Sequence, residues 1–232
     1  MSTEPVNLSD YDFIDFGASK GGCIEFAMAR LGGQRGLGID INTNKAEEMR
    51  RNGYDCIEGD ITKLALTGKS VRFVTMSHIL EHLPDLLSVE EAIKSAAHVA
   101  SDFLFIQGPF FDADEFLKKQ GLRFFWSYWT GHICHLTTWQ LKEILFNLGL
   151  PEHLIMVREV LMDSSDPAIH PLASPINQHE YIPEVHPEKS FITFSPPLYK
   201  EIVCYVRLRP LTNWDTIIKA RKGCYLFEPK QP

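Results

Sequence analysis

The chain has 232 residues, of which 44% are hydrophobic, and its formal net charge at pH 7 is -7. This length and apolar content suit one large domain. The acidic balance disfavours a dedicated nucleic-acid binder, which needs clustered Lys and Arg, although a local basic groove remains compatible with it. No apolar run is long enough to cross a bilayer, and residues 1–10 lack a basic region followed by an apolar core. We therefore expect a cytoplasmic protein with no membrane partner.

The cysteines indicate a reducing compartment. Their number is odd, and no C-x-x-C pair occurs among Cys23, Cys56, Cys134, Cys204 and Cys224. Free thiols of this kind pack as small hydrophobic side chains, so a disulfide framework is not expected.

Strand-like apolar runs alternate with amphipathic stretches from residue 11 to residue 206. The pattern is typical of an α/β fold with a doubly wound, mostly parallel sheet and helices on both faces. Seven strands are predicted, at 12–17, 36–41, 54–57, 71–76, 103–107, 154–161 and 202–208. We expect all of them in a single domain over residues 1–232.

Helices are predicted between these strands. The first, at 22–31, places four apolar side chains on one face: Ile24, Ala27, Met28 and Leu31. Asn42 or Thr43 can cap a second helix that runs to residue 51, and a third covers 86–99. A fourth begins at Thr137 or Thr138 and ends at residue 148, before Gly149.

Two segments interrupt the alternation. The first, 109–136, leaves the carboxyl end of the fifth strand, where open α/β sheets bind ligands. Its aromatic run at 124–129 is interpreted either as a substrate wall or as core beneath a loop. The second, 163–197, is rich in proline and too long for an ordinary turn, so we expect a lid or an oligomer arm. A plain surface excursion is the alternative.

A glycine loop follows the first strand, with the sequence Asp15-Phe-Gly17-Ala-Ser19-Lys-Gly21-Gly22. Glycines there allow a tight turn and a close approach of the backbone to a ligand, and the helix that follows offers free N–H groups. Asp40 stands at the tip of the second strand, where a carboxylate can accept hydrogen bonds from both hydroxyls of a ribose. Together these features predict a site for an adenosine-containing ligand.

The serine at position 19 helps to decide which adenosine-containing ligand the loop binds. A dinucleotide-binding loop has glycine at this position because the pyrophosphate lies against the backbone, and a serine side chain would crowd it. S-adenosylmethionine (SAM) has no pyrophosphate, and Asp15 suits its ammonium group. An NAD(P)-dependent oxidoreductase is therefore the less favoured alternative.

Four ordered motifs carry a family resemblance: the glycine loop, Gly38-Ile-Asp40-Ile41, Glu58-Gly-Asp60-Ile61, and Ser77-His78-Ile-Leu-Glu81-His82-Leu83-Pro84. Over residues 10 to 150 they resemble class I SAM-dependent methyltransferases of the Rossmann-like type. The segment Gly131-His132-Ile-Cys-His135-Leu resembles the small-molecule branch with the Glu-His-Leu signature.

The resemblance implies SAM as cofactor and assigns residues to it. Asp15, Gly17, Ser19 and Gly21 would surround the methionine part, and Asp40 and Ile41 the ribose and adenine. Asp60 and Ile61 would lie at the edge of the adenine. Ser77 and His78 would lie along the inner side of the cofactor.

Three histidines are the candidate catalytic bases: His132, His135 and His78. Imidazole titrates near neutrality and can remove a proton from a hydroxyl or amine acceptor. Gly131 permits a close approach beside His132, which we therefore rank first. The null hypothesis is that these are ordinary loop residues.

No metal site is expected. The sequence His78-x-x-Glu81-His82 matches a zinc-peptidase pattern, but a zinc site needs both histidines on one face of a stable helix, and Pro84 disfavours such a helix. The close spacing of His132, Cys134 and His135 lets at most two of them converge on one ion.

The sequence thus predicts a methyltransferase that moves the methyl group of SAM to a small-molecule acceptor by direct in-line displacement. A nucleic-acid acceptor is not expected, and a homodimer is one option for the assembly. A SAM-binding scaffold without catalytic activity is the alternative from another functional class.

Overall fold

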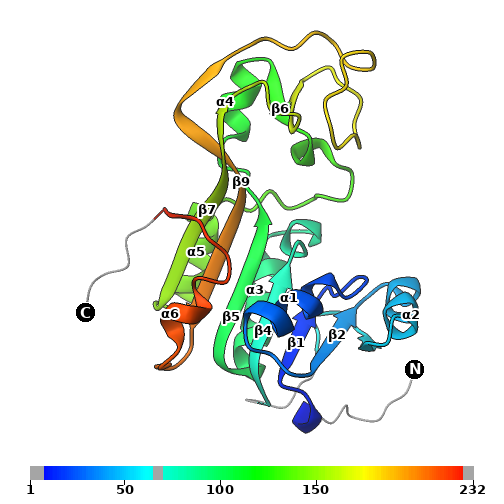
Figure 1. Ribbon diagram of the computed structural model, residues 1–232, viewed down its shortest axis with the longest axis vertical. Coiled ribbons are helices and arrows are strands. Elements are labelled where there is room, and N and C mark those ends of the chain that lie inside the picture. The colour runs from blue at the N-terminus through cyan, green and yellow to red at the C-terminus, as the bar shows by residue number, and fades with distance from the viewer. Residues whose placement is uncertain (1–7, 65–69, 227–232) are drawn as a thin grey trace.

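The protein is described by a computed structural model that covers residues 8–64 and 70–226. Five parallel strands form one half of the main sheet, each followed in the chain by a helix or a turn (Figure 1). They are β1 (Phe13–Phe16), β2 (Gly36–Asp40), β3 (Asp55–Glu58), β4 (Val71–Ser77) and β5 (Ala100–Pro109). Their order across the sheet is β5-β4-β1-β2-β3, so the carboxyl ends of β1 and β4 lie side by side at its centre.

Antiparallel strands complete the other half. A long strand, β9 (Thr193–Arg207), pairs with β5 on one side and with β7 (His153–Asp163) on the other. A two-residue strand, β10 (Cys224–Tyr225), adds to the free edge of β7. The predicted fold class and all seven predicted strands are confirmed, but the count of seven is wrong, because the main sheet has eight strands within residues 8–64 and 70–226. Two exposed residues are too short a run to show the alternation that marks a strand.

Helices cover both faces of this sheet, as predicted. On one face α3 (Leu86–Val99) and α5 (Thr138–Asn147) pack against the larger apolar cluster, which includes Ile14 and Val74. On the other, α1 (Gly22–Arg30), α2 (Thr43–Arg51) and the short α6 (Trp214–Ile217) cover a second cluster built around Phe13 and Phe73. Successive side chains of a strand point to opposite faces, so each central strand contributes to both clusters.

Capping side chains fix where the helices begin. Asn42 accepts the N–H of Lys45 at the start of α2, and Thr137 forms a reciprocal capping box with Gln140 at the start of α5. Both positions match the predictions. The predicted apolar face of α1 is wrong at Met28, whose side chain is 46% exposed, because the buried stripe of this helix is limited to Ile24 and Ala27.

A smaller lobe stands beyond the carboxyl end of the sheet (Figure 1). We call it the cap and define it as residues 110–135 and 164–192. The first segment holds α4 (Asp114–Lys119), β6 (Leu122–Phe124) and a short 3-10 helix, η3 (Trp126–Tyr128); the second holds β8 (Ile169–Pro171). Strands β6 and β8 pair antiparallel, so the two irregular segments of the sequence form one packed unit.

The apolar interior of the cap is continuous with the larger cluster of the sheet. The rings of Phe124 and Trp126 stack with centroids 4.3 Å apart, and both are buried. Arg123 is also buried, and its Nη2 donates to the carbonyls of Ser174 and Pro175 at 2.9 and 3.0 Å. The aromatic run is therefore core at these two positions. The proline-rich segment ends earlier than predicted, because 193–197 already belong to β9.

Candidate functional site

The glycine loop follows β1 and is held in a left-handed backbone conformation at three places. Gly17, Ser19 and Gly21 have φ angles of 72°, 48° and 96°. A Cβ on Gly17 would lie 2.4 Å from the side chain of Ile79, and one on Gly21 would lie 2.7 Å from Tyr54. Glycine is thus required at both positions for conformation and for space.

Asp40, at the end of β2, holds Ser19, the loop residue that has a left-handed backbone without being glycine. Its Oδ2 accepts the backbone N–H of Ser19 at 2.9 Å, and its Oδ1 accepts the N–H of Asn42 at the same distance. Each carboxylate oxygen keeps a further lone pair for a ligand hydroxyl. Beside it, the apolar side chain of Ile41 is 69% exposed, as suits a residue that packs against a flat base.

Asp15 lies beneath the loop and is 1% exposed. Its Oδ1 accepts the hydroxyl of Thr75 at 2.7 Å, whereas its Oδ2 has no hydrogen-bond partner. Burial raises the pKa of this carboxyl to about 7, against the opposing effect of the Thr75 hydroxyl and the nearby Cys23 thiol. A buried carboxylate oxygen without a donor is costly, and an ammonium group would supply the donor. The residues of the loop therefore fit the amino-acid end of SAM.

Asp60 follows β3 and is already engaged within its own turn. Its Oδ1 accepts from the N–H and the hydroxyl of Thr62, and Lys63 lies 3.0 Å from its Oδ2. The bonds from Thr62 are the main reason why the pKa of Asp60 is lowered. Its neighbour Ile61 is buried in the larger apolar cluster, and the N–H of Gly59 donates to the carbonyl of Asp40. These contacts place Asp60 beside the end of β2.

His78 directly follows Ser77, the half-buried last residue of β4, and has a left-handed backbone with φ 52°. Its ring lies between two carboxylates: Nδ1 is 3.4 Å from Glu81, and Nε2 is 3.5 Å from Glu201 on β9. Burial lowers the pKa of this histidine, but the bonds and charges of Glu201 and Glu81 outweigh it and raise the pKa to about 9. His78 is therefore a cation at neutral pH, which does not suit a base.

Gln107 connects the same group of residues from β5. Its Nε2 donates to Glu201 at 3.1 Å and lies 3.3 Å from Nε2 of His78. Arg158 of β7 forms an ion pair with the other oxygen of Glu201 at 2.6 Å. Sequence analysis missed Gln107, Glu201 and Arg158, because antiparallel pairing of distant strands brings them together and no local motif marks them.

His132 and His82 also lie near Glu81, each with one ring nitrogen within 4.8 Å of a carboxylate oxygen of Glu81. Nδ1 of His132 is 2.9 Å from the carbonyl of Trp126, and Nδ1 of His82 is 2.7 Å from the carbonyl of Gly131. The carbonyl of Glu81 accepts the N–H groups of Ile133 and Cys134, which fastens the loop of His132 to the short 3-10 helix η2 (Leu80–His82). As expected, no long helix begins at His78.

His135 occupies a different position. Its Nδ1 is 3.0 Å from a carboxylate oxygen of Asp114 on α4, and its ring stacks on Phe111 with centroids 4.5 Å apart. His132 meets the same Phe111 ring edge-on at 6.4 Å. The three predicted catalytic histidines therefore do not converge on one point: His78 and His132 both lie near Glu81, whereas His135 pairs with Asp114 on α4.

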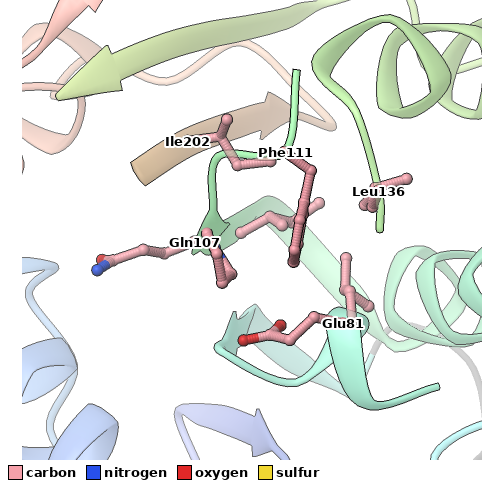
Figure 2. Close-up of a pocket in the computed structure, with 9 residues that line it drawn as sticks. Glu81, Gln107, Phe111, Leu136 and Ile202 are labelled. Atoms are coloured by element: carbon pink, nitrogen blue, oxygen red, sulfur yellow. The ribbon is translucent and has the colours of Figure 1, made fainter. Parts of the chain in front are cut away.

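A small cavity adjoins this region at the carboxyl end of β5 (Figure 2). Glu81 and Gln107 provide its polar groups, and Phe111, Leu136 and Ile202 close it from the side of the cap and β9. Since Glu81 and Gln107 both adjoin His78, the cavity lies next to the end of β4. The glycine loop and the cavity thus share one edge of the sheet.

Membrane crossing receives no support from the described part of the chain. Among residues 8–64 and 70–226, no helix combines the length and the apolar character that a bilayer span requires.

Solved structures with the same fold include several methyltransferases. A SAM-dependent methyltransferase from Archaeoglobus fulgidus matches with a TM-score of 0.58 and 15% identity, over 87% of this chain and 88% of that one. The YcgJ protein from Bacillus subtilis matches with a TM-score of 0.56 and 12% identity, over 88% and 94%. A possible histamine N-methyltransferase from Thermotoga maritima matches with a TM-score of 0.52 and 16% identity, over 86% and 82%. At these identities the likeness concerns the fold.

Sequence comparison identifies the family. No curated protein matches the chain. The family model of FtsJ-like methyltransferases, however, matches residues 4–124, which is more than half of the chain and includes the glycine loop, Asp40 and His78. This match favours SAM over the dinucleotides that the glycine loop alone would allow. The chain therefore belongs to the FtsJ-like methyltransferase family and is an enzyme that transfers methyl groups from S-adenosylmethionine.

Proposed function

We propose that this methyltransferase acts on a small-molecule acceptor that binds between the ends of β4 and β5 and the cap. The observation that carries the proposal is the polar group of Glu81, Gln107 and His78, which lies at the edge of the sheet that holds the glycine loop. It adjoins the cavity of Figure 2, which has room for about one water molecule. An acceptor bound on this group, below the cap, would lie beside a cofactor on the ends of β1, β2 and β4.

For the cofactor we propose the residues that the sequence predicts. Asp15, Gly17, Ser19 and Gly21 would hold the amino-acid end, a role supported by the unpaired Oδ2 of Asp15. Asp40 and Ile41 would bind the ribose and the adenine. Asp60 and Ile61 would border the adenine edge, although the carboxylate of Asp60 is largely occupied by Thr62 and Lys63. Ser77 and His78 would lie along the inner side.

The work of the protein in this reaction is mainly orientation. SAM supplies a methyl group that its sulfonium already activates, so the bond to the acceptor forms as the carbon–sulfur bond breaks and S-adenosylhomocysteine leaves. The chain must align the acceptor with that bond and exclude water, and such alignment can account for many orders of magnitude in rate. His78, a cation between Glu81 and Glu201, would position this edge of the site rather than remove a proton.

Of the three candidate bases, His132 is best supported. Its Nδ1 bonds to the carbonyl of Trp126, which leaves the lone pair of its Nε2 free, and one of its ring nitrogens lies within 4.8 Å of a carboxylate oxygen of Glu81. That lone pair can take a proton from the acceptor or bind a metal ion that activates it. His135 is engaged with Asp114 and stacked on Phe111, so we propose that it shapes the cap.

The charges around the cavity favour an acceptor without a phosphate backbone. Glu81 and Glu201 are the nearest charged partners of His78, and Arg158 is neutralised by Glu201. The two carboxylates balance the cations His78 and Arg158, so this group offers no excess positive charge to hold a phosphate backbone.

We further propose that residues 1–232 act as a single domain in which the cap is a lid over the acceptor. The packing of the aromatic segment on the proline-rich segment supports this role. A cytoplasmic location is proposed from the cysteines, which are unpaired in the described chain.

The test is a methyl-transfer assay with radiolabelled SAM and a cell extract divided by size. Label in compounds that pass a small-pore filter would support the proposal. Label only in retained RNA or protein would overturn the small-molecule acceptor while leaving SAM dependence intact.

A further inference from the structure

Three possible metal ligands that are distant in sequence meet at the edge of the proposed acceptor site. A carboxylate oxygen of Glu81 and one ring nitrogen each of His82 and His132 lie within 4.8 Å of one another. Glu81 and His82 come from η2, and His132 comes from the loop after η3. The bonds from Ile133 and Cys134 to the carbonyl of Glu81 hold these two elements together.

Both imidazoles are held by a backbone carbonyl through Nδ1. A backbone carbonyl only accepts hydrogen bonds, so the Nδ1 atoms that contact Trp126 and Gly131 must carry the protons. The Nε2 atom of each ring is then left with a free lone pair. Histidine ligands of metal ions characteristically donate their other N–H to a carbonyl or carboxylate, which fixes both the tautomer and the orientation of the ring.

Glu81 provides an independent observation. Its side chain is 2% exposed, and its Oε1 has no hydrogen-bond partner. Nδ1 of His78 lies 3.4 Å from this oxygen and pairs with it by charge, beyond the usual distance of a hydrogen bond. Leaving a buried carboxylate oxygen without a donor is costly, and a cation bound between Glu81 and the two imidazoles would satisfy it.

We propose that Glu81, His82 and His132 bind a divalent transition-metal ion such as Zn²⁺ or Mn²⁺. Two imidazoles and one carboxylate suit these ions and leave coordination positions open for another oxygen. Small side-chain shifts would bring the three atoms from their present spacing to metal-bond distances of about 2.0–2.2 Å. This set replaces our expectation of no metal, and it differs from the zinc-peptidase pattern in using His132 instead of His78.

The position suggests a role that rests on the proposed function. A metal ion here would bind a hydroxyl oxygen of the acceptor and lower the pKa of that hydroxyl, so that it loses its proton to solvent water near neutral pH before methyl transfer. Nε2 of His132 would then serve as a ligand and not as a base.

Metal binding is tested on the full chain after treatment with a chelator. Calorimetric titration with Zn²⁺ and Mn²⁺ should show one site, and Co²⁺ should give a visible absorption band upon binding. His132→Ala, His82→Ala and Glu81→Gln should each weaken binding at least tenfold, whereas His98→Ala, at an exposed position on α3, should not. Because Glu81 is buried, the two exposed or half-exposed histidines keep the test valid if Glu81→Gln fails to fold.

Absence of binding, or equal binding by the wild type and the histidine variants, would overturn the metal site. SAM titrations run alongside separate the two proposals. SAM binding without metal binding contradicts only the metal site, and metal binding without SAM binding contradicts only the proposed cofactor site. Loss of methyl transfer on chelation and its return with the metal would support the role in activation, and transfer unaffected by chelation would contradict it.

Discussion

Asp40 accepts the backbone N–H of Ser19 at 2.9 Å across 21 residues of sequence. The side chain that we propose as the ribose ligand therefore also holds the glycine loop in its left-handed conformation. Ser19 has a φ of 48° without being glycine, and this hydrogen bond helps to stabilise that conformation. Binding of the ribose and the shape of the loop are thus coupled through one carboxylate.

Replacement of Asp40 should consequently have a larger effect than loss of one ligand contact. We expect Asp40→Ala to weaken SAM binding at least tenfold, or about 1.4 kcal/mol, by calorimetry. Asp55→Ala, which removes an exposed partner of Arg35 on the neighbouring strand, is the control and should leave SAM binding unchanged. Equal affinity of the Asp40 variant and the wild type would mean that the ribose lies elsewhere.

The affinity for SAM should depend on pH through Asp15. Burial raises the pKa of this carboxyl to about 7, so it is mostly protonated at pH 5.5 and increasingly ionised toward pH 7. Only the carboxylate pairs with the ammonium group of SAM, so affinity should rise roughly tenfold from pH 5.5 to 7. His78, with a pKa of about 9, keeps its charge throughout this range.

Asp15→Asn should remove this pH dependence and bind SAM more weakly at pH 7. The same linkage affects folding without ligand. The folded state holds the proton of Asp15 more tightly than the unfolded chain does, so this group contributes stability that is lost as the pH rises toward 7. Affinity that does not change with pH in the wild type would contradict a contact between Asp15 and the ammonium group.

Gly17 offers a test of close approach in the loop. Gly17 has a positive φ, and a Cβ there would lie 2.4 Å from the side chain of Ile79. Gly53 also has a positive φ, of 88°, but no atom lies within 4 Å of its Cβ position. Gly17→Ala should therefore lower the thermal midpoint more than Gly53→Ala and weaken SAM binding at least tenfold. The Gly53 variant measures the conformational strain alone. Equal changes in thermal midpoint and SAM affinity for the two variants would contradict the close packing of Gly17 against Ile79.

Arg123 should hold the cap together. Its buried guanidinium donates to the carbonyls of Ser174 and Pro175 and stacks on Tyr128 at 4.6 Å. Arg123→Met should cost about 1–3 kcal/mol of unfolding free energy and speed proteolysis within 164–192. If the cap is the lid of the acceptor site, KM for the acceptor should rise while the affinity for SAM stays constant. Lys118→Met, at an exposed position of α4, is the control.

The alternating half of the fold could be predicted from the sequence because its signals are local. Strands β1, β2, β4 and β5 are apolar runs, and the helices α2 and α3 between these strands begin at the capping residues Asn42 and Asp85. The glycine loop and Asp40 were visible for the same reason, because tight turns need particular residues at fixed offsets.

The acceptor side could not be predicted in this way. Glu201 reaches Gln107 from 94 residues away because β9 inserts between β5 and β7 in an antiparallel direction. Strands β6 and β8 have three residues each, too few to show a period, so the cap appeared only as two irregular segments. His82 and His132 meet through a loop held by backbone hydrogen bonds, which leave no trace in residue type.

The central claim is a SAM site on the glycine loop that opens toward the cavity beside His78. Calorimetry of the wild type and of Asp40→Ala with SAM, S-adenosylhomocysteine and NAD tests it most directly. We predict that both adenosyl ligands bind the wild type with one site each, that the variant binds them at least tenfold more weakly, and that NAD does not bind. Binding of NAD alone, or equal binding of SAM by both proteins, would contradict the account.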